Sequence, residues 1–225
     1  MINSTAVIFF SRSAKAEIKH KTFCGTNVYA NKRMAVNLYD NSLRAVKRAG
    51  LPFFIFDEQN QTGNNFGERI SSAFKHIFEK GFESVIVVGS DSPSLTAEHI
   101  TNAAKLLSEN LVVAGPTQLG GCYLLGMQQC LFNQKLFASL QWQTSRLMQD
   151  LQQQFGRQLT LLPTAIEVNN EHHLIQFSTK PIDVNNNMRQ FMLLFRSIIY
   201  NVIRGFLKPQ LLPAISIATG QGRAP

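Results

Sequence analysis

Short apolar runs alternate along the chain with longer stretches in which apolar residues recur every three or four positions. The runs are rich in β-branched and aromatic residues and lack polar alternation, which is typical of strands buried on both faces of a sheet. We therefore predict a strand in each run. The runs cover residues 6–10, 53–56, 85–88, 111–114 and 159–162, with a further short strand at 122–125.

The stretches between the first four runs predict amphipathic helices, because residues three or four apart share one face of a helix. Apolar residues follow this spacing over residues 34–49, 70–78 and 100–107. Glycine and proline at 50–52, and glycine at 81, mark helix ends. The order strand, helix, strand predicts an α/β fold, in which a mostly parallel sheet is flanked by helices on both faces.

The length and the charge distribution indicate one domain with a basic appendage. The chain has 225 residues, 44% of them hydrophobic, and we place the domain at 1–180 and the appendage at 181–225. The net charge of +8 resides in residues 1–57 and 188–225. It excludes an acidic disordered chain. Because no RNA- or DNA-binding motif accompanies it, we expect no specific nucleic-acid partner.

Cysteine spacing and hydropathy favour a cytoplasmic location. The three cysteines form no CxxC pair and lack zinc-type spacing to histidine, so neither a zinc module nor a disulfide scaffold is indicated. The apolar run near the N-terminus has no basic segment ahead of it and is too short for a signal peptide. The most apolar later stretch, 191–207, is interrupted by Arg196 and Arg204 and makes a poor transmembrane span.

The appendage contains a predicted amphipathic helix at residues 188–208. Arg189, Arg196 and Arg204 share its polar stripe, and the remaining circumference is apolar. So wide an arc needs a cover, since burying each large apolar side chain contributes about 1.5–3 kcal/mol. The main domain, a second copy of the chain in a homodimer, or an anionic membrane surface would serve, and the last would make the protein membrane-peripheral. We favour contact with a protein surface.

Three loops that follow predicted strands hold candidate ligand-binding residues, because open parallel sheets bind ligands beyond the carboxyl ends of their strands. Asp91 in the first loop either holds Mg²⁺ or Mn²⁺ or only satisfies backbone amides of its turn. Gly120 and Gly121 in the second allow a ligand to approach the backbone. Glu167 and Asn169 in the third offer oxygens to the same crevice, or are ordinary turn residues.

The loop after the first predicted strand is strongly basic. It is either a solvated run of charges or a set of partners for a diphosphate, because lysine and arginine bind phosphate groups. Its cationic residues are Arg12, Lys15, Lys19 and Lys21.

Five sequence blocks, in this order, resemble a bacterial family. They are GER at 67–69, GSDSPSLT at 89–96, GPTQLGGCYLLGM at 115–127, LQWQTS at 140–145 and LLPTAIEVNNEHHL at 161–174. The chain resembles the GT-A-like proteins usually described as nucleotide-diphospho-sugar transferases, or as glycosyltransferases associated with radical-enzyme gene clusters.

This resemblance implies a single GT-A Rossmann-like domain that binds a nucleoside-diphosphate sugar donor with Mg²⁺ or Mn²⁺. It implies a metal site at Asp91, with Glu167 and Asn169 completing the coordination. Nucleotide contacts are implied in the basic loop and at Arg69. Substrate contacts are implied at Gly120, Gly121, Tyr123, Trp142 and Thr144.

Two departures from the family pattern bear on activity. Gln118 and Leu119 stand where the family is acidic, and Asn169 replaces its final aspartate, so that site carboxylates are lost in both segments. Asn169 still offers a carbonyl oxygen to a metal, but without charge. The leading hypothesis is a metal-dependent glycosyltransferase with an unidentified acceptor. The alternatives are a nucleotidyltransferase and a catalytically degraded protein that binds or scaffolds.

Overall fold

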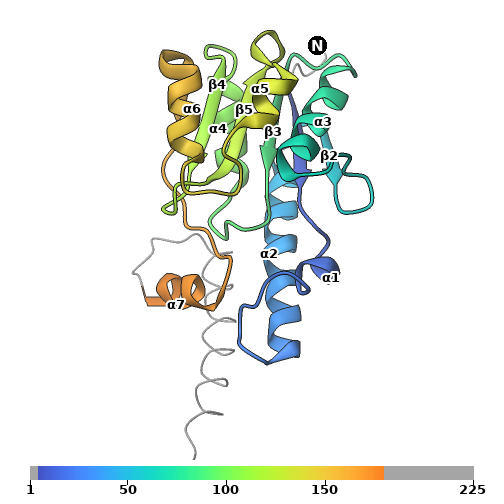
Figure 1. Cartoon of the computed structure of the whole chain (residues 1–225), viewed down its shortest axis with the longest axis vertical. Coiled ribbons are helices and arrows are strands. Elements are labelled where there is room, and N and C mark those ends of the chain that lie inside the picture. The colour runs from blue at the N-terminus through green and yellow to red at the C-terminus, as the bar shows by residue number, and fades with distance from the viewer. Residues whose placement is uncertain (1–4, 180–225) are drawn as a thin grey trace, which may run out of the picture.

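The apolar runs become the strands of one six-stranded sheet (Figure 1). The strands are β1 (Thr5–Phe10), β2 (Phe53–Phe56), β3 (Ser84–Val88), β4 (Val112–Pro116), β5 (Cys122–Gln128) and β6 (Leu159–Leu161). They lie in the order β2-β1-β3-β5-β4-β6. β5 runs antiparallel to β3 and β4, and the other neighbouring pairs are parallel. The predicted mostly parallel sheet is confirmed.

The computed structural model describes residues 5–179. The predicted helix at 188–208 and its cover lie outside these residues. Within the described range, no helix combines the length and hydropathy that a membrane crossing requires.

Helices cover both faces of the sheet. They are α1 (Ala14–Glu17), α2 (Val28–Arg48), α3 (Phe66–Phe78), α4 (Ala97–Leu106), α5 (Gln134–Ser139), α6 (Leu147–Phe155) and α7 (Glu171–Thr179). Side chains of α3, α5 and α6 pack with Ile8 and Val85 on one face. Side chains of α2 and α4 pack with Val7 and Ile86 on the other. Successive side chains of a strand point to opposite faces of the sheet, so the sheet has a separate hydrophobic layer on each face.

The two edge strands depart from the prediction of strands buried on both faces. Phe53 in β2 is 36% exposed and Leu161 in β6 is 52% exposed, whereas every residue of β1 and β3 is buried. An edge strand has a neighbour on one side only, so flanking helices cover it less completely. Composition cannot distinguish such a strand from a central one.

A third, smaller hydrophobic cluster lies beyond the edge of the sheet where β1 and β3 end. Phe23 from the basic loop and Met34 from α2 pack there with Val168 and Leu174. Figure 1 shows the amino-terminal half of α2 extending past the sheet, with α1 and α7 near it. This cluster therefore brings the basic loop and the segment before α7 to the same end of the sheet.

Candidate active site

A cavity opens at the point in the sheet where successive connections lead to opposite sides of β1. β1 connects to β2 on one side, and the chain then crosses to β3 on the other side of β1. Ligands of open α/β sheets bind at such switch points. A pocket of about 500 Å³ lies there, and residues that follow β1 and β3 line it together with the start of β5.

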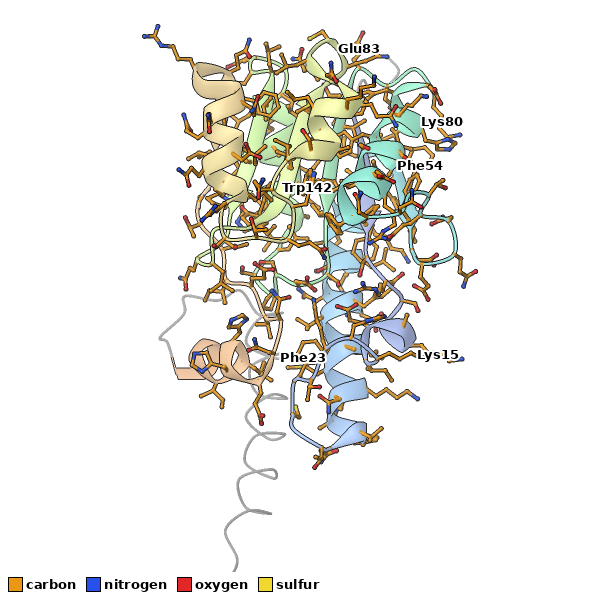
Figure 2. The ribbon with its side chains drawn as sticks, viewed as in Figure 1. Lys15, Phe23, Phe54, Lys80, Glu83 and Trp142 are labelled. Atoms are coloured by element: carbon orange, nitrogen blue, oxygen red, sulfur yellow. The ribbon has the colours of Figure 1, made fainter. Side chains whose placement is uncertain are left out.

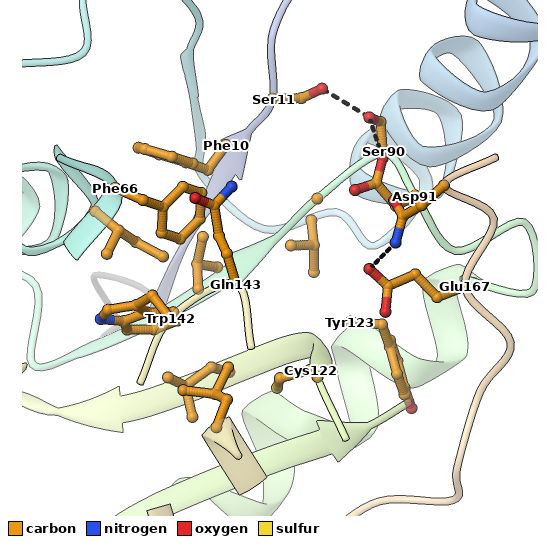
Figure 3. Close-up of a pocket in the computed structure, with 18 of the residues that line it drawn as sticks. Phe10, Ser11, Phe66, Ser90, Asp91, Cys122, Tyr123, Trp142, Gln143 and Glu167 are labelled. Atoms are coloured by element: carbon orange, nitrogen blue, oxygen red, sulfur yellow. Dashed lines mark hydrogen bonds between the residues drawn. The ribbon is translucent and has the colours of Figure 1, made fainter. Parts of the chain in front are cut away.

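The loop after β3 is fixed in place by hydrogen bonds to both neighbouring segments. The Ser11 hydroxyl donates to Ser90 Oγ at 2.7 Å, which joins the ends of β1 and β3 (Figure 3). The backbone amide of Val168 donates to the Asp91 carbonyl at 2.8 Å, and Ser92 Oγ donates to the Ile166 carbonyl at 2.8 Å. Asp91 therefore enters the pocket from a rigid turn.

Lys21 forms the two shortest ion pairs among the residues that line the pocket. Its ammonium group lies 2.6 Å from the Asp91 carboxylate and 2.8 Å from the Glu17 carboxylate. Arg12 reaches Glu17 at 3.3 Å. Burial alone would lower the pKa of Lys21, but the charges of Asp91 and Glu17 outweigh it and leave that pKa raised above its ordinary value. Lys21 is therefore a fixed cation in the pocket wall.

The structure divides the predicted nucleotide-binding residues into two groups. Arg12, Lys21 and Arg69 line the pocket. Lys15 and Lys19 are exposed and lie outside its lining, and Figure 2 shows Lys15 pointing away from the body of the protein. The reading of these two lysines as a solvated charge run therefore agrees with their position.

Glu167 and Asn169 line the same pocket as Asp91, which is where the sequence predicts the third loop to lie. The Asn169 side-chain amide donates to the Glu167 carboxylate at 2.6 Å. No ion pair joins Glu167 to any of residues 5–179. Glu167 is thus a pocket carboxylate that is oriented by an amide and is not neutralised by a cation.

The divalent cation that the resemblance implies does not fit these side chains as they are arranged. Lys21 already holds the Asp91 carboxylate, and its positive charge would repel a metal ion. The Asn169 amide nitrogen is bonded to Glu167, so Asn169 has only one uncharged carbonyl oxygen to offer a metal. Over residues 5–179, no three His, Cys, Asp or Glu side chains form a group that could ligate a metal.

Trp142 forms an aromatic wall of the pocket. Its indole N–H donates to the Phe137 carbonyl at 2.7 Å, and its ring lies 5.7 Å from Phe66 and 5.1 Å from Phe137. A Cβ on Gly67 would meet the Ala138 carbonyl oxygen at 2.0 Å, so only glycine lets α3 approach this segment so closely. Thr144, the next predicted contact in this wall, also lines the pocket.

Gly121 lines the pocket, whereas Gly120 packs behind it. Gly120 has φ +81°, and a Cβ there would lie 2.1 Å from the Ser145 carbonyl oxygen, so it lets two loops meet. Tyr123 borders the pocket, but its hydroxyl donates to the Pro163 carbonyl at 3.2 Å. Burial raises the pKa of Tyr123 to about 12. Both residues therefore support the wall around Gly121.

The family becomes clear when these features are set beside known proteins. The model of the family described as "Uncharacterized protein conserved in bacteria (DUF2064)" matches residues 31–144. The chain belongs to the DUF2064 family. No curated protein matches it.

One of the solved structures that align with this DUF2064 protein shares its fold, and others align more loosely. A "putative nucleotide-diphospho-sugar transferase" from Desulfovibrio desulfuricans G20 aligns with a TM-score of 0.70 at 19% identity, over 90% of this chain and 98% of its own. A homologue of Rv0371c from Mycobacterium sp. strain JC1 aligns at 0.44, with 13% identity over 89% and 100%. A cytidylyltransferase from Leptospira borgpetersenii serovar Hardjo-bovis aligns at 0.43, with 8% identity over 89% and 96%. The first alignment establishes a GT-A-like fold for the DUF2064 chain, and the other two are too loose to add to it.

Among the lining residues of the DUF2064 pocket that were missed from the sequence are Glu17, Ser90 and Gln143. Glu17 has a detectable signal, because it precedes Lys21 by four residues and could pair with it on one helical turn. Ser90 belongs to the block around Asp91 and could have been included with it. Gln143 lies between two predicted contacts, Trp142 and Thr144, and could have been included with them, but its positive φ has no signal in the sequence because it depends on the packing around the residue.

Proposed function

We propose that the pocket binds a nucleoside-diphosphate-linked sugar and that the protein transfers the sugar to an acceptor hydroxyl group. The division of the lining carries this proposal: two cations, Arg12 and Lys21, line the pocket and are suited to a diphosphate. Figure 3 shows the aromatic rings of Trp142 and Phe66 on the side opposite Asp91, the carboxylate that Lys21 contacts. A nucleotide sugar has the matching parts, a charged diphosphate and a ring rich in hydroxyl groups. The similarity to the Desulfovibrio protein, which is described as a nucleotide-diphospho-sugar transferase, supports the same ligand class.

In this proposal, Arg12 and Lys21 bind the diphosphate. Arginine and lysine form charge-assisted hydrogen bonds with phosphate oxygens. Lys21 is positioned for this contact before the ligand arrives, because Asp91 and Glu17 hold its ammonium group. Its two carboxylate partners also compensate part of its charge, so the strength of the phosphate contact depends on how far Lys21 turns from Asp91 to the ligand.

Glu167 is the group best placed to accept a proton from the acceptor, because it carries no cationic partner among residues 5–179. As the acceptor hydroxyl passes its proton to Glu167, its oxygen forms a bond to the anomeric carbon of the sugar. The bond from that carbon to the diphosphate oxygen breaks, and the nucleoside diphosphate leaves with the electron pair. Asn169 keeps the carboxylate turned toward the pocket.

Ligand binding can be measured through Trp142, which is the single tryptophan of the chain and lines the pocket. UDP-, GDP-, CDP- and ADP-linked sugars are titrated with EDTA present and with Mn²⁺ present, while tryptophan fluorescence is recorded. At least one nucleotide sugar of the panel should change the tryptophan fluorescence of the wild type. The same nucleotide sugar should cause no change in Lys21→Met. Lys19→Met is the matched control, because Lys19 lies outside the lining and should behave like the wild type. If no member of the panel binds, the proposal is wrong.

A second candidate function is that of a binding protein without catalysis. Leu119 lines the pocket with 40% of its surface exposed, where the resembling family carries an acid. A leucine can neither donate nor accept a proton. Donor binding without release of the nucleoside diphosphate in the presence of many acceptors would favour this candidate over the transferase.

A further inference from the structure

The loop that carries Trp142 contains a backbone conformation unlike any other in the described chain. Gln143 has φ +59°, and over residues 5–179 it is the one non-glycine residue with positive φ. An L-residue reaches this region only at an energetic cost, and asparagine, aspartate and histidine are the types that tolerate it best. Glutamine is an unusual occupant of this conformation.

The residues around Gln143 force this conformation. On one side, Trp142 is fixed by its bond to the Phe137 carbonyl. On the other, Thr144 Oγ1 donates to the Gln141 carbonyl at 2.8 Å and accepts from the Arg146 amide at 3.1 Å. Strained residues persist where their surroundings over-determine them, and they cluster at binding sites. The loop thus holds Gln143 in place at the expense of its backbone.

The side chain of Gln143 is directed into the pocket. It lines the cavity, and Figure 3 shows it extending from its loop toward the side where Phe10 and Phe66 lie. No hydrogen bond joins its amide to any of residues 5–179. The amide offers one acceptor oxygen and two N–H donors beside the Trp142 ring. This combination of a flat apolar ring and an amide suits a sugar, which has C–H faces and hydroxyl edges.

We propose that Gln143 is a specificity-determining residue that hydrogen-bonds the hydroxyl groups of the sugar part of the donor. The inference rests on the proposed function and adds the part of the ligand that this wall recognises. The strained backbone fixes the point from which the side chain enters the pocket before the ligand binds, so that only the side chain itself is ordered on binding. Arg12 and Lys21, which contact the diphosphate in the proposed function, act independently of it.

The experiment compares each nucleotide sugar with its free nucleoside diphosphate, for example UDP-glucose with UDP, by calorimetry. Gln143→Gly removes the amide and relieves the backbone. We expect its denaturation midpoint to rise by roughly 2–4 °C, its affinity for the diphosphate to stay within twofold, and its affinity for the nucleotide sugar to fall about 3- to 10-fold. Gln143→Asn keeps an amide and tolerates the same φ, so it should recover part of the affinity for the sugar.

Gln141→Ala is the matched control, because Gln141 is an exposed glutamine of the same loop that lies outside the lining. It should leave both affinities unchanged. Equal losses for UDP and UDP-glucose in Gln143→Gly, or no loss for either, would overturn the role in sugar recognition. An unchanged or lower denaturation midpoint would overturn the strained arrangement from which the role is inferred. Failure of the wild type to bind any nucleotide would instead overturn the proposed function, and this inference with it.

Discussion

The Lys21 ammonium group lies 2.6 Å from the Asp91 carboxylate, and this contact joins the basic loop after β1 to the turn after β3. Asp91 was predicted as a metal ligand and Lys21 as a nucleotide contact, so two residues expected to bind different parts of a ligand bind each other. Because of this ion pair, metal binding by Asp91 and phosphate binding by Lys21 depend on each other. Substituting each residue in turn tests the two kinds of binding separately.

Lys21→Met should let the pocket bind a divalent cation more tightly. The variant removes the positive charge beside Asp91 and leaves the carboxylates of Asp91 and Glu17 without their ammonium partner. Calorimetry with Mn²⁺ alone should show an affinity at least about tenfold higher than in the wild type. Lys19→Met, outside the lining, should match the wild type. Equal Mn²⁺ affinity in wild type and Lys21→Met would show that Lys21 does not compete with a metal.

Asp91→Asn should strengthen binding of a nucleoside diphosphate when EDTA is present. The lining contains three cationic and three anionic side chains, so loss of one carboxylate leaves an excess of positive charge and releases Lys21 toward the phosphates. We expect an increase of about two- to fivefold, measured by fluorescence titration. A large decrease that appears only with Mn²⁺ would instead support Asp91 as a metal ligand, as the resemblance implies.

Glu167→Gln should abolish transfer while retaining donor binding. The amide cannot accept the acceptor proton, so release of the nucleoside diphosphate should slow by roughly 10²- to 10⁴-fold, whereas the donor affinity measured through Trp142 should stay within a few-fold. Glu109→Gln, an exposed substitution away from the pocket, provides the control. Full transfer by Glu167→Gln would rule out the proposed base.

The free energy of unfolding should fall as the pH falls below about 6.5, the ordinary pKa of histidine. Burial lowers the pKa of His99, whose ring accepts the Thr96 amide at the start of α4. The unfolded chain therefore binds a proton before the folded chain does, and stability is lost on acidification through this range. Denaturant titrations at a series of pH values from 7.5 to 5.5 give the free energy of unfolding at each pH. This free energy should fall less steeply with falling pH in His99→Gln than in the wild type. His20 is exposed, so His20→Gln should show the same dependence of the free energy of unfolding on pH as the wild type.

The positions of the strands and of the acidic residues followed from the sequence. The period of two in a strand and of three to four in a helix is written into the order of apolar residues, and β1, β2 and β3 appear within one residue of their predicted bounds. Because parallel strands end at one edge of the sheet, the chain order also placed Asp91 and Glu167 in one crevice.

The partners of these residues were decided by the tertiary structure. Four cations of the basic loop are equivalent in sequence, yet Lys21 reaches Asp91 whereas Lys15 and Lys19 face solvent. Irregular loops have no period from which side-chain direction can be read, and their path depends on distant contacts such as the packing of Phe23 against Val168. The conformation of Gln143 has the same origin, since segments held on either side of it impose a positive φ that no local preference of glutamine predicts.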